Sequence, residues 1–282
     1  MVWFHATRLT KAALLKRMPA NDALLMWVDF AELRRTGFLQ LLGGAKPAED
    51  PEYRSFVYST RFDYMTDLDS ALVSFPRNGS VYVIVQGRFD WKSLRSYVAR
   101  EHGQCVNSLC RMVGSTPDRH ISFLPLRTDL MAMAVGPEAY AVDEIAAPPV
   151  KPYPQVPEGV VWVKFPGSMP RSWQNLPDGA RPFARIVENA PSVMVSFVIE
   201  GDRLGANLEI ECRSAQEASE LATQFTSTTE LARNLIAREH QTPNPADFSG
   251  ILTSGVFRAE GSRVLGHWPI DRAFIRSLLG TQ

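Results

Sequence analysis

The sequence lacks both an excess of charge and a long hydrophobic run. Its 282 residues include 30 Lys and Arg and 30 Asp and Glu, so the formal net charge is zero. Nucleic-acid binders normally carry a basic excess, and this balance argues against nucleic acid as a partner. No apolar run approaches the ~20 residues that span a bilayer, so we expect no transmembrane segment in this chain. The opening WFHATRLTKAALLKRMP lacks a signal peptide's continuous apolar region, and an export or anchor segment upstream in a precursor stays open.

The sequence also lacks the short motifs of common catalytic and metal sites. Its five histidines form no metal-binding spacing, and the nucleophile-elbow, phosphate-loop and dinucleotide patterns are absent. Asp63, Asp67 and Asp69 invite a calcium interpretation, but the tight-turn glycine and distal glutamate of an EF-hand loop are missing. Turn preference explains these aspartates, and a strand-to-helix junction capped by Asp90 explains Arg88 and Asp90. We therefore predict no catalytic, cofactor-binding or metal-binding residue.

Cysteine is rare, and its three copies divide into a close pair and a single residue. Cys105 and Cys110 are separated by four residues, among them the turn formers Asn107 and Ser108. This spacing closes a small loop and suits a hairpin disulfide in an oxidising compartment. Two reduced structural thiols, or metal or redox chemistry, are the alternatives that the spacing leaves open. Cys212 falls within the apolar alternation of a predicted strand.

A proline-rich connector separates two halves of the chain that resemble each other. Residues 148–158 contain five prolines, which fix φ and donate no backbone hydrogen bond, so this segment is expected to be extended and semi-rigid. WVDF at 27–30 matches WVKF at 162–165, and ALVSF at 71–75 matches VMVSF at 193–197. Because element order and turn position agree as well, the pattern indicates an internal duplication.

The order of the expected elements indicates the fold class. Each half runs through a strand, a helix, a hairpin and a capped helix, with the caps at Asp90 and Ser214. This β-α-β-β-α-β order is typical of a ferredoxin-like unit. We therefore predict an α+β protein of two tandem ferredoxin-like units with antiparallel sheets, joined by the proline-rich connector. The expected boundaries are an N-terminal helical segment at 1–19, a first repeat at 20–147, the connector at 148–158 and a second repeat at 159–282.

Several local predictions are specific. Asn78-Gly79 is expected to form the turn of a hairpin, because it joins two β-rich runs. GPEAYAVDEIA at 136–146 is expected to close the first repeat as a helix, and ARIVENA at 184–190 to form a short helix. ILTSGVFRAEGSRVLGHW at 251–268 is expected to form a second hairpin.

Some phrases resemble a bacterial family. They are WVDFAELRRTG, GRFDWKSL, the Cys105–Cys110 loop, ILTSGVF and GHWPIDRAF, together with the leading segment. The resemblance covers nearly the whole chain and is to a family of bacterial envelope proteins, chiefly acidobacterial, for which no activity is known. It implies an extracytoplasmic protein, periplasmic or membrane-anchored, normally preceded by an N-terminal anchor that this chain lacks. No catalytic residue carries over from it.

Three functions follow as expectations. The first is a non-enzymatic binding or scaffold module of the cell envelope, with an unknown protein or small molecule as partner and no cofactor. The alternative is a haem-binding protein or other enzyme built on paired ferredoxin-like units, with His240 or His267 as the axial ligand. The second alternative is a thiol–disulfide switch at Cys105 and Cys110. That pair follows a helix end, where no helix N-terminus lowers a thiol pKa, so a structural clip is favoured over a switch.

Overall fold

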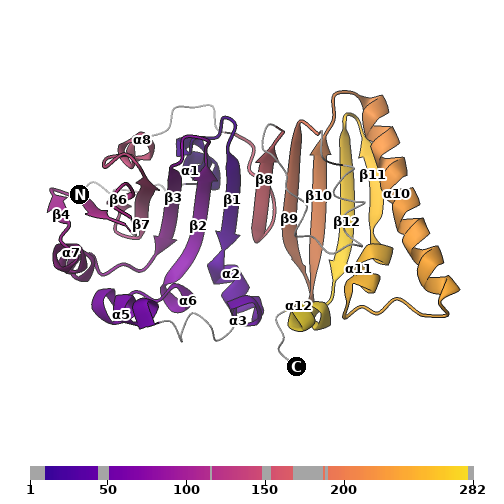
Figure 1. The fold of residues 1–282 in the computed structure, drawn as a ribbon, viewed down its shortest axis with the longest axis horizontal. Helices are drawn as coiled ribbons and strands as arrows, with labels where there is room; N and C mark the ends of the chain where they lie inside the picture. The colour runs from indigo at the N-terminus through magenta and orange to yellow at the C-terminus, as the bar shows by residue number, and fades with distance from the viewer. Residues whose placement is uncertain are drawn as a thin grey trace, which may run out of the picture. The chain divides into compact units, whose positions relative to one another are not determined.

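A computed structural model describes residues 10–43, 51–114, 116–147, 154–167, 187 and 190–278 (Figure 1). The chain divides into two compact units, residues 1–25 with 50–157 and residues 26–49 with 158–282. The later division falls at the end of the predicted connector, of which residues 148–153 lie outside the described part. Residues 26–49, which the sequence places in the first repeat, group with the second unit, where the Asp29 amide donates to the Val160 carbonyl at 2.7 Å.

The first unit is an antiparallel sheet with helices. Its strands follow the order β2-β3-β7-β6-β5-β4. The predicted turn at Asn78-Gly79 is confirmed, because Gly79 adopts a φ of 78° and the Ser80 amide donates to Asn78 Oδ1. The described elements of this unit are α1 (Lys11–Arg17), α5 (Pro51–Thr60), α6 (Tyr64–Asp67), β2 (Leu68–Phe75), β3 (Val81–Gly87), α7 (Trp91–Arg100), β4 (Gln104–Val106), β5 (Leu109–Val113), β6 (His120–Arg127), β7 (Leu130–Gly136) and α8 (Asp143–Ala146).

One face of this sheet is buried through a row of small and polar side chains. Ser74, Tyr82, Ala134 and Ser122 stand opposite one another on β2, β3, β7 and β6, and none is more than 2% exposed. The Ser74 hydroxyl donates to the Pro19 carbonyl just after α1. The Ser122 hydroxyl accepts from the amide of Val142 just before α8. These bonds tie the segments around α1 and α8 to this face, because buried polar groups need partners.

The second unit is also an antiparallel sheet with helices. Its strands follow the order β11-β12-β10-β9-β8-β1. The described elements are β1 (Leu24–Asp29), which begins at the boundary between the units, α2 (Phe30–Arg35), α3 (Phe38–Gly43), β8 (Val161–Pro166), β9 (Ser192–Glu200), β10 (Arg203–Glu211), α10 (Ala215–Arg238), α11 (Phe248–Ser254), β11 (Val256–Glu260), β12 (Arg263–Ile270) and α12 (Arg272–Leu278).

The long helix α10 forms the core of the second unit. Ser214 accepts from the Glu217 amide at 3.1 Å, which confirms the predicted cap at the start of the helix, and the Glu217 carboxylate accepts from the Arg213 amide at 2.7 Å. Ala218, Ala222 and Phe225 recur at helical spacing, so they share one face, and all are buried. They pack in one cluster with side chains of β9, β10 and β12, namely Val193, Leu208, Ile210 and Val264.

The structure confirms the α+β class with antiparallel sheets but does not confirm the ferredoxin-like units. In a ferredoxin-like unit the helix-connected strands form a split β-α-β motif, in which another strand lies between them. Here β8 and β9 are direct neighbours and pair antiparallel. In the first unit helix α7 connects β3 with β4, and three strands, β7, β6 and β5, lie between them instead of one.

The predicted hairpin at 251–268 is partly wrong. Asp247 Oδ1 accepts from the Ser249 amide at 2.7 Å, and this cap starts a helix that continues to Ser254. The hairpin therefore begins only at Val256. The predicted helix at 136–146 is also shorter than expected, since β7 runs through Gly136 and α8 covers Asp143–Ala146. Most of the predicted helix at 184–190 lies outside the described residues.

Candidate functional site

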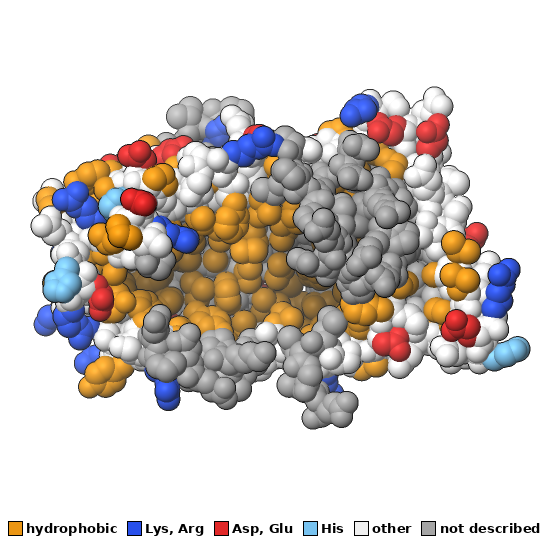
Figure 2. Space-filling model, in the orientation of Figure 1, with side chains coloured by type: hydrophobic (Ala, Val, Ile, Leu, Met, Phe, Trp, Pro, Cys, Tyr) orange, Lys and Arg blue, Asp and Glu red, His pale blue; other side chains and the backbone are white. Residues whose placement is uncertain are grey.

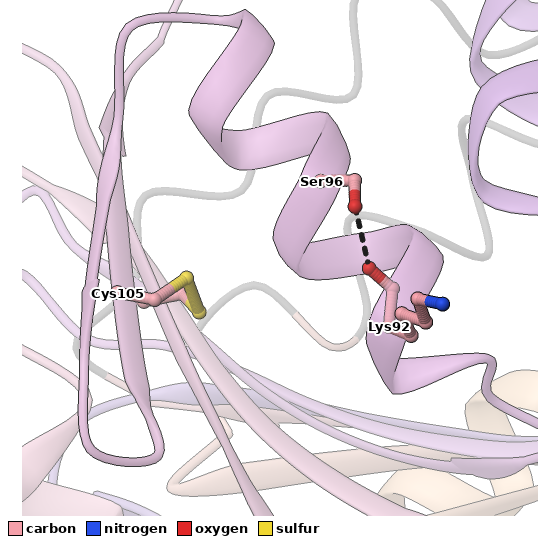
Figure 3. The surroundings of a disulfide bond; sticks show 4 residues. Lys92, Ser96 and Cys105 are labelled. Carbon is pink, nitrogen blue, oxygen red and sulfur yellow. Dashed lines mark hydrogen bonds between the residues drawn. A yellow bond between two sulfur atoms is a disulfide. The ribbon is translucent and has the colours of Figure 1, made fainter.

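The predicted cysteine pair forms a disulfide. Cys105 lies opposite Cys110 in the β4–β5 hairpin, and the two sulfur atoms are bonded (Figure 3). Asn107 turns the chain between them with a φ of 55°. Cys110 is 1% exposed and packs with Val98 of α7 and with Phe123 of β6. The bond therefore clips a sheet edge beneath a helix and is part of the core.

Cys212 is separate from this pair. It is a free cysteine that lies just after β10, not within the strand that the sequence predicts, and it packs partly buried against the core of the second unit. Burial, together with the nearby Glu217 carboxylate, raises the pKa of its thiol. A raised pKa makes the thiolate scarcer, so this residue lacks the character of a reactive cysteine.

The face of the first unit's sheet opposite α8 is apolar across all its strands. The register aligns Val73, Val83, Met133, Phe123 and Cys110 in a single row. Side chains of one face recur at every second residue, so this face also carries the two flanking rows. Both flanking rows are apolar as well. One consists of Val81, Val135, Ile121 and Met112, and the other of Ala71, Val85, Met131 and Pro125.

Helix α7 covers one end of this face. Helix α7 packs through Val98 onto Cys110 and Phe123, while Met131 and Met133 border that cluster partly buried. Figure 2 shows a hydrophobic hollow over β2 and β3. We call the part of the face on β2, β3 and β7 the apolar floor. Its members are Ala71, Val73 and Val85, which are buried, and Val81, Val83, Met131, Met133 and Val135, which are half-buried.

A polar pocket lies on the other side of β3, next to α8. Its volume is 440 Å³, and its walls come from the β2–β3 turn, from β3 and from the segment between β7 and α8. The Tyr82 hydroxyl donates to Glu144 Oε2 and accepts from Asn78 Nδ2 at 3.4 Å. Burial, followed by the hydrogen bond to Glu144, raises the pKa of the Tyr82 hydroxyl. The residues that line the pocket are Asn78, Ser80, Tyr82, Pro137, Glu138, Tyr140, Ala141 and Glu144.

The two histidines considered as haem ligands occupy polar positions in the second unit. Nδ1 of His267 lies 2.9 Å from Asn207 Oδ1, and its Nε2 lies 3.6 Å from a carboxylate oxygen of Glu200. Both ring nitrogens thus have a polar partner, and an axial bond to iron would replace one of them. His240 is exposed just beyond the end of α10. The arrangement does not favour the haem alternative.

The aspartates and the Arg88–Asp90 segment have structural roles. Asp63 caps α6 by accepting from the Met65 amide at 2.9 Å, and Asp67 forms an ion pair with Arg88 at 3.2 Å. Asp90 caps α7, as predicted, by accepting from two backbone amides of its first turn. Within the described ranges no group of three or more His, Cys, Asp or Glu is arranged to hold a metal ion.

None of the helices in the described residues has both the length and the hydrophobicity to cross a membrane.

Sequence reasoning missed both the floor and the pocket. The alternating runs VYVIVQG and LMAMAVG each indicate a strand with one apolar side. Neither run predicts that β3 pairs with β7, which is what builds the floor. Tyr82 and Glu144 are 62 residues apart, and no local pattern joins them. Long-range register decides both features.

No protein-family model matches the chain, and no characterised protein matches it. Among solved structures the chain is similar to TP0453 in several crystal forms. Form I is 10% identical with a TM-score of 0.47, covering 91% of this chain and 93% of that chain. Form III is 9% identical with a TM-score of 0.48, covering 92% and 94%. Form IV is 9% identical with a TM-score of 0.45, covering 92% of each chain. At these TM-scores the likeness carries no conclusion about the fold or the function of this chain.

Proposed function

We propose that this protein is a non-enzymatic binding module of the bacterial cell envelope, and that it holds an uncharged, elongated apolar ligand on the apolar floor. The observation that carries the proposal is the three-row apolar face of the first unit's sheet, hollowed over β2 and β3 (Figure 2). Five of the eight floor side chains are only half-buried by the chain itself, so a ligand can remove further apolar surface from water there.

The side chains of the floor define the chemistry of the ligand. The floor carries no charged group and no hydrogen-bonding side chain, so a polar ligand would lose its water without compensation there. An apolar ligand instead gains roughly 25 cal/mol for each Å² that it removes from water. Met131 and Met133 lie on neighbouring rows, and their flexible thioethers adapt to ligands of irregular shape. An acyl chain has the uncharged, flexible and apolar character that this surface fits.

The disulfide supports the choice of compartment. Disulfides persist in oxidising compartments and are rare in the reducing cytosol. Cys110 is almost completely buried, and the hairpin that it clips borders the same face as the floor. These properties favour a structural clip in an extracytoplasmic protein over a thiol–disulfide switch, whose reactive cysteine is usually accessible.

The experiment is a titration with N-phenyl-1-naphthylamine, an uncharged apolar probe whose fluorescence rises in apolar surroundings. The double variant V83T/M131Q places two polar groups on the floor, and we expect it to weaken probe binding about tenfold. The matched control is V106T/V113T, which makes similar changes at exposed positions of β4 and β5 and should leave binding unchanged. Equal probe affinity in the floor variant and the wild type contradicts the proposal.

A second measurement uses only the wild-type chain, so a folding defect in a variant cannot affect its result. In the wild-type chain with ¹³C-labelled methionine methyl groups, saturating probe should shift the Met131 and Met133 signals and leave that of the buried Met18 in place. If the Met131 and Met133 signals stay where they were at saturation, the floor is not the binding surface.

A further inference from the structure

The pocket beside α8 is a site separate from the apolar floor. Successive residues of a strand point to opposite faces of the sheet, so Tyr82 lines the pocket while Val83 belongs to the floor. The pocket measures 440 Å³ and is open to solvent, since five of its eight lining residues are exposed.

A directed chain of hydrogen bonds runs through this pocket. The Ser80 amide donates to Asn78 Oδ1, Asn78 Nδ2 donates to the Tyr82 hydroxyl, and that hydroxyl donates to Glu144 Oε2. Tyr82 is 2% exposed, so the donor that orients the Glu144 carboxylate is itself held rigidly by the core. Hydrogen bonds linked in this way polarise one another, and they place the carboxylate in advance of binding.

The charged groups that line the pocket are negative, and the guanidinium of Arg111 borders it at Tyr140. Glu138 and Glu144 are its two ionisable carboxylates, and none of the lining residues is Lys, Arg or His. Tyr140 adds an aromatic ring, and Pro137 and Ala141 add apolar surface. The ring of Tyr140 already attracts one cation, since the guanidinium carbon of Arg111 lies 4.9 Å from its centroid.

We propose that this pocket binds an organic cation, namely the protonated amine of a small molecule with a short apolar body. The ammonium group would lie against the carboxylates of Glu138 and Glu144, and its hydrogens would be donated to them. The apolar body would pack on Tyr140 and Ala141. An anion would meet two like charges in the same place, so the pocket selects by charge.

The test is a two-dimensional amide NMR titration of the intact chain with n-butylammonium chloride. We expect saturable shifts at the amides of Ser80, Tyr82 and Ala141. E138Q and E144Q should each weaken the binding about threefold, and the double variant about tenfold. Glutamine at position 144 keeps an oxygen that accepts from Tyr82, so the local fold is retained. The matched control is E101Q at an exposed position after α7, which should bind like the wild type.

The neutral isostere 1-butanol makes the test decisive without any variant. Equal shifts of the same amides by 1-butanol would show an apolar crevice instead of a cation site and would overturn the inference. An equal loss of affinity in E101Q would show non-specific charge attraction, with the same consequence. Absence of saturable shifts with n-butylammonium also overturns it, and leaves the apolar floor unaffected.

Discussion

Cys110 lies directly opposite Phe123 in the β5–β6 ladder, and the same cross-strand row continues through Met133 and Val83 to Val73. The disulfide that joins Cys110 to Cys105 is therefore the outermost member of the row that forms the centre of the apolar floor. An oxidised hairpin, a packed helix and a half-buried apolar surface thus share one face of one sheet.

Removal of the disulfide should destabilise the first unit. The bond closes a loop of a few residues, for which chain entropy predicts a loss of about 2 kcal/mol in the variant C105S/C110S. Urea unfolding with and without reductant measures this loss. Reductant should lower the midpoint of the wild type and of C212S, but not that of C105S/C110S. An unchanged wild-type midpoint in reductant would show that the clip contributes no stability.

The core of the second unit should depend strongly on Phe225. This side chain is 1% exposed, and its ring stacks on that of Phe257 at a centroid distance of 4.7 Å. F225A should cost about 3–5 kcal/mol, because it leaves a cavity under α10. L231A changes an exposed residue of the same helix, and it should stay within about 0.5 kcal/mol of the wild type. Similar losses for both variants in denaturant titrations would refute this assignment of the core.

The N-terminal cap of α10 should make a smaller contribution. The Ser214 hydroxyl accepts from the Glu217 amide, so S214A leaves a backbone donor of the first turn without its partner. We expect a loss of about 1 kcal/mol, measured by chemical unfolding. The matched variant S219A lies at an exposed position inside the same helix, and it should be neutral or slightly stabilising since alanine favours helices.

The cap of α7 should make stability depend on pH. Backbone and side-chain hydrogen bonds from Ser93 hold the pKa of the Asp90 carboxyl below its ordinary value. A lowered pKa means that the folded state prefers the carboxylate. The resulting stability is present above the ordinary pKa and is lost as the pH falls through the folded-state pKa.

The comparison with D90N measures this effect, because asparagine still caps a helix but does not titrate. The stability difference between the wild type and D90N should shrink as the pH falls from about 7 to about 3. A difference that is the same at every pH would show that the Asp90 charge plays no part.

Local features of the fold were predictable where neighbouring residues decide them. The caps at Asp90 and Ser214, the turn at Asn78-Gly79 and the hairpin disulfide are each confirmed. In each case the donor and the acceptor, or the two sulfur atoms, lie within a few residues of each other. The cap at Asp247 is equally local, but the apolar run after it, which the sequence predicts to be a strand, forms a helix.

The sequence by itself determined the α+β class, the pairing of Cys105 with Cys110 and the alternation that makes each strand apolar on one side, because these depend on local spacing and on residue type. The strand order was decided only by tertiary structure. So were the row from Cys110 to Val73, the hydrogen bond of Tyr82 to Glu144 and the separation of floor from pocket. Each of these requires pairing between segments that are distant in the chain. Such pairing is selected by the packing of whole sheets and helices, which no short window of residues contains.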